Sequence, residues 1–164
     1  MPDLPTLKLE RSFDAPPALV WRGWTEAELL SRWYGGGGGA TILDIDARVG
    51  GHAEIVMNWG GQSQYQRFEF LELERASRLV FVIVTTDSAG RPAPAPHAPD
   101  WPTRLLTTVT LAPASGGTLQ TPTWVPPDAT AREIAAFEAA LPMLGRGWGS
   151  GFDALAALLA NLPD

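Results

Sequence analysis

The residues that could carry chemistry in this chain are few, and their spacing matches no familiar catalytic set. The chain has no cysteine and two histidines, His52 and His97, neither with an evident serine partner. Without cysteine there is no thiolate nucleophile, disulfide or thiolate metal site. Ser150 lies in the sequence 147–151 (GWGSG), but a nucleophile elbow needs serine at the centre of Gly-x-Ser-x-Gly, after a strand. We therefore expect a non-enzymatic protein with no catalytic residues.

One group of residue types could bind a metal ion. It consists of Asp44, Asp46, His52 and Glu54. Strand alternation would place the two aspartates together and His52 with Glu54 on a hairpin, where a hard cation is conceivable. We favour solvated residues on an outer face. Two histidines without cysteine do not suit structural zinc, so we expect no metal and no other cofactor.

The composition narrows the class of protein and of partner. The net charge of −6, with Lys8 as the single lysine and scattered arginines, argues against nucleic acid and anionic membranes as partners. With 45% apolar residues over 164 positions, the chain suits one soluble domain spanning 1–164. The first residues carry neither a basic lead nor a hydrophobic stretch, so we expect a cytoplasmic protein without a signal peptide.

The first forty residues predict one strand and two short helices. Alternation over 6–13 is typical of a strand. Asp14 can cap a helix that ends near Gly23. A capping box over 25–28 then opens a second helix, which the glycines at 35–39 end.

The middle of the chain predicts an antiparallel meander. Period-two patterns cover residues 41–48, 52–59, 64–73, 79–86, 104–112 and 118–124. Three glycine pairs, at 50–51, 60–61 and 116–117, suit hairpin corners. The proline-rich segment 91–102 should be stiff and extended. Pro122 cannot donate to a ladder, so we expect a bulge or an early strand end there.

The end of the chain predicts one long amphipathic helix. Thr130 and Glu133 form a capping box, and apolar residues follow at helical spacing as far as Leu162. Pro142 should bend or break this helix. The concave face of the preceding sheet is the one surface large enough to bury its apolar stripe.

Several motifs occur in an order that resembles a known family. They are APPALVW at 15–21, LSRWYG at 30–35, DARVGG at 46–51, SRLVF at 77–81 and Gly147-Trp148. With the order of elements, they resemble the activator-of-Hsp90-ATPase homologue branch of the helix-grip (START, SRPBCC, birch-pollen-allergen-like) superfamily over nearly the whole chain. The resemblance implies an α+β fold, in which a curved seven-stranded antiparallel sheet wraps around the C-terminal helix. Two short helices would lie between the first two strands. The match of Asp46 and Arg48 to the family motif also implies an ion pair between them near the turn at 50–51.

The resemblance also implies a cavity between the last helix and the sheet, which many relatives use for apolar ligands. An empty cavity of ~300 Å³ would cost about 7 kcal/mol, so bulky side chains, water or a ligand must occupy such a space. The side chains expected as its wall or lid are Trp33, Tyr34, Met57, Trp59, Trp101, Met143, Trp148 and Phe152. Core and pocket wall are the same surface here, so each of these residues could equally be structural.

The leading hypothesis is a module that binds a small hydrophobic or amphipathic molecule in this cavity. The alternative is a protein-interaction module of co-chaperone type, acting on a chaperone partner as the family name implies. A cyclase or hydrolase of the same superfamily ranks third, because no paired acid and base can be placed. A homodimer is plausible, but no sequence feature decides it.

Overall fold

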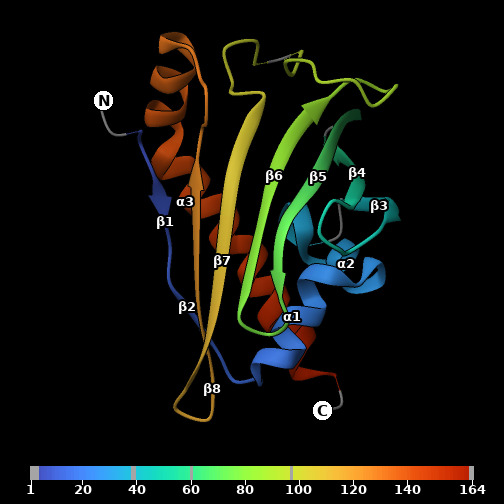
Figure 1. Ribbon diagram of the computed structural model, residues 1–164, viewed down its shortest axis with the longest axis vertical. Coiled ribbons are helices and arrows are strands. Elements are labelled where there is room, and N and C mark those ends of the chain that lie inside the picture. The colour runs from blue at the N-terminus through green and yellow to red at the C-terminus, as the bar shows by residue number, and fades with distance from the viewer. Residues whose placement is uncertain (1–3, 38–39, 60, 97, 163–164) are drawn as a thin grey trace.

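Within its described residues, the chain forms one antiparallel sheet and three helices. This computed structural model describes residues 4–37, 40–59, 61–96 and 98–162, but not the side chain of Trp59. The helices are α1 (Pro17–Thr25), α2 (Ala27–Gly37) and α3 (Ala131–Ala160). The strands are β1 (Leu7–Lys8), β2 (Arg11–Phe13), β3 (Ala40–Ile45), β4 (His52–Trp59), β5 (Gln62–Glu74), β6 (Arg78–Thr86), β7 (Arg104–Ala114) and β8 (Gly117–Val125). Figure 1 shows α3 running along one face of the sheet, with α1 and α2 beside its C-terminal end.

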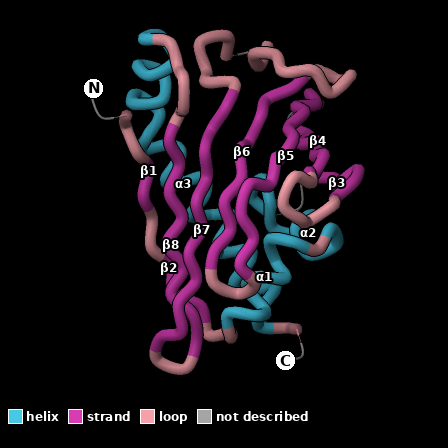
Figure 2. Tube along the Cα trace, in the orientation of Figure 1, coloured by secondary structure: helices cyan, strands magenta, loops and turns pink. Residues whose placement is uncertain are grey.

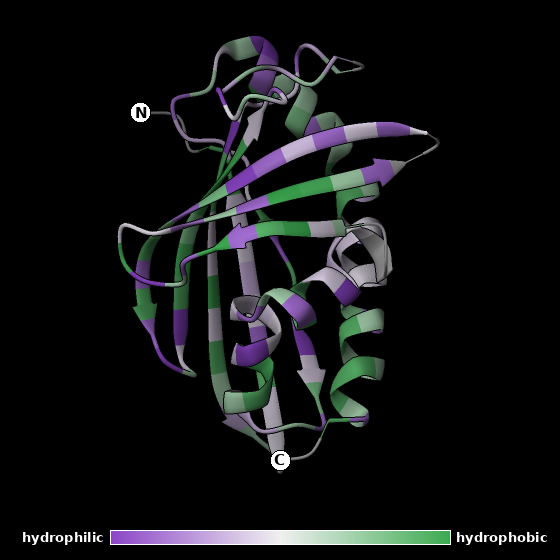
Figure 3. Cartoon of the chain, turned by 90° about the vertical axis from the view of Figure 1, so that its right-hand side faces the viewer, coloured by the Kyte–Doolittle hydropathy of each residue, from purple (hydrophilic) through white to green (hydrophobic). Residues whose placement is uncertain are grey.

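The order of strands in the sheet is β1-β8-β7-β6-β5-β4-β3, with β2 also paired to β8, and the sheet does not close into a barrel. All pairings are antiparallel and mostly join neighbours in sequence (Figure 2). Hydrophobic and hydrophilic residues alternate along several strands (Figure 3), among them β7 and β8, because successive side chains point to opposite faces of a sheet, whereas β6 is buried on both faces. The helix-grip architecture expected from the sequence is therefore confirmed.

Pro122 affects the sheet differently from the prediction. β8 continues through it without a bulge, and Pro122 pairs with Val109 in β7. On the other side, Leu9 donates to the Pro122 carbonyl over 3.1 Å, but proline has no N–H with which to return the bond. The interruption therefore falls in the strand that pairs with β8, which is split into β1 and β2. Both pieces keep the same register with β8.

The two short helices begin differently from the prediction. Pro16, not Asp14, is the N-cap of α1, and it makes no side-chain cap. Thr25 is the last residue of α1, and its hydroxyl donates to the Trp21 carbonyl at 2.9 Å. The capping box expected over 25–28 is therefore wrong, because that hydroxyl is used inside the preceding helix.

The long helix α3 begins as predicted and continues past its proline. Thr130 and Glu133 form a complete capping box, and Pro142 lies within a continuous helix. Its fully buried residues are Phe137, Gly151, Phe152, Leu155 and Leu159. In the described part of the chain, no helix combines the length and apolar character needed to cross a bilayer.

Candidate functional site

The structure brings most of the predicted wall residues together between α3 and the sheet. The side chains of Trp33, Tyr34, Met57 and Phe152 are buried, and those of Trp101 and Trp148 are half-buried. The side chain of Trp59 lies outside the described part of the structure.

Met143 is the exception among the predicted wall residues, since its side chain is 64% exposed. At 100° per residue, position 143 lies on the opposite side of α3 from Leu141, which packs against the core. Met143 therefore does not line the interior, contrary to the expectation from the sequence.

A cluster of aromatic rings fills the space under the C-terminal half of α3. Trp24 and Trp33 meet edge to face with ring centroids 4.7 Å apart. Trp124 and Trp148 lie 4.6 Å apart, and Phe152 lies 6.2 Å from Trp24. Such spacings are typical of favourable aromatic pairs, so this part of the interior is packed core.

Close contacts between helices seal the same half. The indole Nε1 of Trp33 donates to the Gly23 carbonyl over 2.8 Å and ties α2 to α1. A Cβ at Gly23 would lie 2.8 Å from Leu155, and one at Gly151 would lie 3.5 Å from the Trp33 carbonyl oxygen. A Cβ at Gly23 would therefore require the Leu155 side chain to shift, whereas one at Gly151 would make an ordinary van der Waals contact.

The N-terminal half of α3 is held less tightly. Its inward residues Leu141 and Leu144 pack against the core but remain partly exposed. Only Phe137 is fully buried before Gly151. This half of the interface with the sheet therefore keeps apolar surface within reach of solvent.

The proline-rich loop after β6 is attached to the start of α3. Glu133 accepts from the backbone N–H of Thr130 at 2.9 Å and of Thr103 at 3.2 Å. These bonds, led by that from Thr130, hold the pKa of Glu133 below its ordinary 4.5. Trp101, two residues before Thr103, packs on Phe137 with centroids 5.8 Å apart. Trp101 thus covers the first turns of α3.

The inner face of the sheet carries polar groups that sequence reasoning did not select. The Tyr34 hydroxyl donates to Gln66 Oε1 over 2.7 Å, and burial raises the pKa of Tyr34. The indole of Trp24 donates to Gln120 Oε1 over 2.8 Å. Strand alternation could have found them, because Gln66 shares the phase of the buried Phe68.

Three buried side-chain atoms have no hydrogen-bond partner among the described residues. They are Gln64 Oε1, Gln120 Nε2 and Trp124 Nε1. A buried polar group without a partner costs about 1–3 kcal/mol, so such groups are rare in a structural core. They lie on the inner face of β5 and β8.

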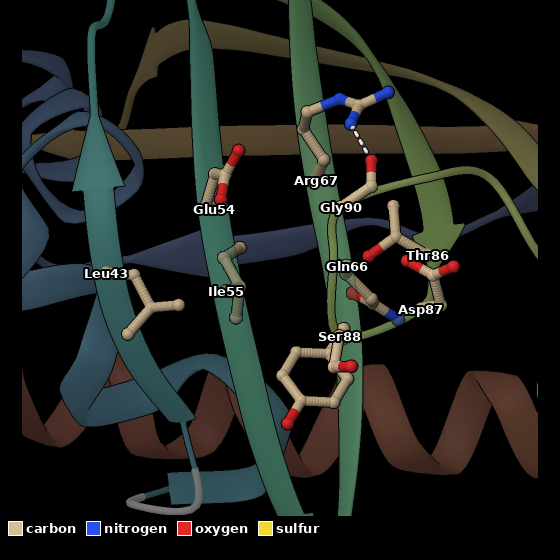
Figure 4. Close-up of a pocket in the computed structure, with 10 residues that line it drawn as sticks. Leu43, Glu54, Ile55, Gln66, Arg67, Thr86, Asp87, Ser88 and Gly90 are labelled. Carbon is tan, nitrogen blue, oxygen red and sulfur yellow. Dashed lines mark hydrogen bonds between the residues drawn. The ribbon is translucent and has the colours of Figure 1, made fainter.

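Two hollows lie outside the α3–sheet interface. One of about 30 Å³ lies between β4, β5 and the loop after β6 (Figure 4). It holds one or two water molecules at most, and Arg67 reaches past it to the Gly90 carbonyl. The other, about 340 Å³ and open to solvent, lies between Glu28 and Ser31 of α2 and Thr41 of β3. Neither hollow contains a predicted wall residue.

The residues considered for metal binding form separate pairs. His52 Nε2 lies 2.8 Å from Asp44 Oδ2, and Arg48 pairs with Asp46 at 2.7 Å as expected. Across the described ranges, no three His, Asp or Glu side chains gather as a metal ion would require. His97 lies outside the described residues.

Comparisons with known proteins agree with the fold. The family model described as Activator of Hsp90 ATPase homolog 1-like protein matches residues 14–160. Protein Ms6760 from Mycobacterium smegmatis superposes with a TM-score of 0.78 at 22% identity, over 99% of both chains. A protein from Arthrobacter aurescens superposes with a TM-score of 0.79 at 23% identity, over 97% of this chain and 88% of that one. Protein NE0264 from Nitrosomonas europaea superposes with a TM-score of 0.71 at 29% identity, over 94% of each chain. No curated protein matches the chain.

Proposed function

The chain belongs to the Activator of Hsp90 ATPase homolog 1-like family, and from this premise we propose that it binds a small hydrophobic or amphipathic molecule between the N-terminal half of α3 and the sheet. The single observation that carries the proposal is the unsealed apolar row of Leu141 and Leu144. Covering apolar surface contributes about 25 cal/mol per Å². A ligand bound on this row would cover apolar surface that the protein itself leaves partly exposed to solvent.

Polar groups on the inner face of the sheet support an amphipathic ligand. The orphaned Gln64 Oε1 would accept from a ligand hydroxyl, and the orphaned Trp124 Nε1 would donate to a ligand oxygen. Pockets for small molecules commonly combine apolar walls with a few such groups. The rings of Trp101 and Phe137 would close the site at the start of α3.

A thermal-shift screen with fatty acids, sterols, aromatic polyketides and flavonoids tests the proposal. At least one class should raise the melting temperature in proportion to its concentration, because a ligand that binds only the folded state stabilises it. If no compound changes the melting temperature, the proposed function is wrong.

A matched pair of variants on α3 locates the site. Leu144→Gln places an amide on the inward row, whereas Met143→Gln places the same amide on the outer face. We expect Leu144→Gln to weaken binding at least tenfold and Met143→Gln to leave it unchanged. Equal effects would place the ligand elsewhere.

A co-chaperone-like interaction is the second candidate. The family description favours it, and so does an exposed apolar pair, with Val49 exposed by 65% and Leu71 by 48%. Bonds of 2.9 and 3.0 Å between Gly50, Gly51 and Phe70 hold the two segments together. Exposed apolar patches commonly mark interaction sites.

Adding the protein to a bacterial Hsp90-type ATPase separates the two candidates. A co-chaperone should change the ATPase rate, and Val49→Asp with Leu71→Asp should abolish that change. An unaltered rate, together with no capture of the chaperone, would remove this candidate.

A further inference from the structure

One edge of the sheet is open at β1 and β2. They pair with β8 on one side, and among the described residues no strand lies on their other side (Figure 1). The backbone N–H of Leu9 donates to Pro122 of β8. Because neighbouring residues of a strand turn their backbone groups in opposite directions, those of Lys8 and Glu10 point away from the sheet. They can therefore pair with a strand from another chain.

The same two residues carry charges that have no partner in the described part of the chain. Burial alternates from Leu7 to Phe13, and the side chains of Lys8 and Glu10 are both exposed on the outer face. Neither takes part in an ion pair with another described residue. A lysine alone on an edge strand discourages pairing between chains, but here a glutamate stands two positions away. Together the two residues are neutral, whereas the chain as a whole has a net charge of −6.

This edge is complementary to itself in an antiparallel register centred on Leu9. With a two-fold axis at that residue, Lys8 of each copy lies opposite Glu10 of the other copy. An axis at Lys8 or at Glu10 would place like charges opposite each other, which is unfavourable. In the register centred on Leu9, Thr6 lies opposite Ser12 of the other copy, and both are exposed. Residues 6–12 therefore suit such a ladder along their whole length.

The long helix leaves room beside this edge. Asp153 of α3 pairs with Arg11 over 2.7 Å, so this side of α3 lies over β2. Gly145 and Gly149 precede Asp153 at four-residue spacing, which places all three on that side. A Cβ at Gly145 would meet only Leu9, at 3.9 Å, and one at Gly149 would meet no atom within 4 Å. This side of α3 therefore presents little side-chain bulk toward a neighbouring molecule.

We propose that two copies of the chain pair along this edge, through an antiparallel ladder of residues 6–12 centred on Leu9. The outward-facing backbone groups supply the hydrogen bonds, and two pairs of Lys8 with Glu10 fix the register. The two-fold axis uses the edge of both copies, so this contact closes at the dimer. A ladder about 24 Å long buries less than the ~800 Å² per partner of a standard interface. The dimer therefore forms reversibly.

Exchange of the two charges tests the pairing by sedimentation velocity, with protein from about 1 µM to about 1 mM. The wild type should pass from monomer to dimer over this range. Lys8→Glu and Glu10→Lys each place like charges opposite each other twice, and each should weaken dimerisation about tenfold. The double variant Lys8→Glu with Glu10→Lys restores both pairs and should dimerise like the wild type. All three variants should fold normally, because both side chains are exposed.

Arg75→Glu is the control for net charge. It changes the charge by the same amount as Lys8→Glu, but in the exposed turn between β5 and β6, and it should leave dimerisation unchanged. A wild type that stays monomeric at about 1 mM would overturn the proposal. So would a double variant that dimerises no better than the single variants, or a loss in Arg75→Glu as large as that in Lys8→Glu.

A single cysteine tests the position of the axis, because the chain has none of its own. In the proposed ladder, the two Leu9 Cα atoms lie about 4.5 Å apart, within reach of a disulfide. The two Ser12 Cα atoms lie about 20 Å apart. Under mild oxidation, Leu9→Cys should give a covalent dimer, and Ser12→Cys on the same edge should stay monomeric. Equal cross-linking of the two variants would contradict the register.

Mixed cysteine variants give the same test at exposed positions, should Leu9→Cys fold poorly. Leu9 packs against the core, whereas Lys8 and Glu10 are exposed. Lys8→Cys mixed with Glu10→Cys should yield a covalent heterodimer, because the two Cα atoms lie about 5.5 Å apart across the ladder. Glu10→Cys mixed with Ser12→Cys should not, because those Cα atoms lie about 13 Å apart along the strands. If the second mixture cross-links as well as the first, the proposed pairing is wrong.

Discussion

The C-terminal half of α3 and its N-terminal half meet the rest of the protein in different ways. From Gly151 onward, buried residues press against α1, α2 and a packed aromatic cluster. Before Gly151, the inward side chains other than Phe137 stay half-exposed, and the beginning of the helix is held by Glu133 and Trp101. The comparison teaches that the burial of α3 is concentrated in its C-terminal half.

The largest expected difference is between leucines on the two halves. Leu155→Ala should lower the free energy of unfolding by about 2–5 kcal/mol, because its side chain is fully buried. Leu144→Ala should cost less than about 1.5 kcal/mol, because Leu144 is half-exposed. Urea denaturation measures both values. Equal losses would contradict the division of α3 into a tight and a loose half.

Pro142 lies in the looser half, where it removes one helical hydrogen bond. A proline in a helix interior is about 3 kcal/mol less favourable than alanine, and the more flexible unfolded chain of the variant offsets part of this. Pro142→Ala should therefore raise the free energy of unfolding by about 2 kcal/mol. Unchanged or lower stability in urea would show that the surrounding structure already accommodates the proline.

Glu133 provides a pH-dependent test of how the looser half is attached. Glu133→Ala removes the cap and the bond to Thr103, and should cost about 1 kcal/mol at neutral pH. Because the native pKa of Glu133 is lowered, its contribution is complete above the ordinary value of 4.5 and declines as the pH falls through the native pKa. Thermal melts from pH 2 to pH 7 measure the difference between wild type and variant.

Glu133→Gln is the control for this experiment, because an amide does not titrate in this range and its one oxygen can still accept the capping bond from Thr130, although the bond from Thr103 is lost. The stability difference between Glu133→Gln and Glu133→Ala should hardly vary with pH. If the difference between wild type and Glu133→Ala is equally constant, the carboxylate does not contribute as described.

The smallest expected effect is on the outer face of α3. Met143→Ala should change the free energy of unfolding by no more than about 0.5 kcal/mol, because Met143 is 64% exposed. Thermal or urea denaturation can measure this value beside that of Leu144→Ala. A larger loss would mean that Met143 packs against something in solution, such as a second copy of the chain.

Much of the fold could be predicted from local patterns. The capping box at Thr130 and Glu133 was found because it depends on residues three positions apart. Gly50 and Gly116 were recognised as corners, and both have positive φ. The capping box predicted at Thr25 does not form, because the Thr25 hydroxyl donates instead to the Trp21 carbonyl one turn earlier.

The candidate site was predictable only in part. Aromatic residues such as Trp33 and Phe152 were selected by type and helical phase, and both lie in the interior. Gln120 and Trp124 were missed, because their interest lies in which polar atoms stay without a partner among the described residues. That property depends on neighbours far apart in sequence, such as Trp24 and Gln120.

By itself, the sequence determined the order of elements, the antiparallel sheet and the burial of a long C-terminal helix. Periodicity, capping and turn chemistry act between residues that are close along the chain, so they can be read without coordinates. Only the tertiary structure decided which half of α3 is sealed, and where the effect of Pro122 falls. Both outcomes arise from contacts between distant segments, where the space left by one side chain depends on all of its neighbours.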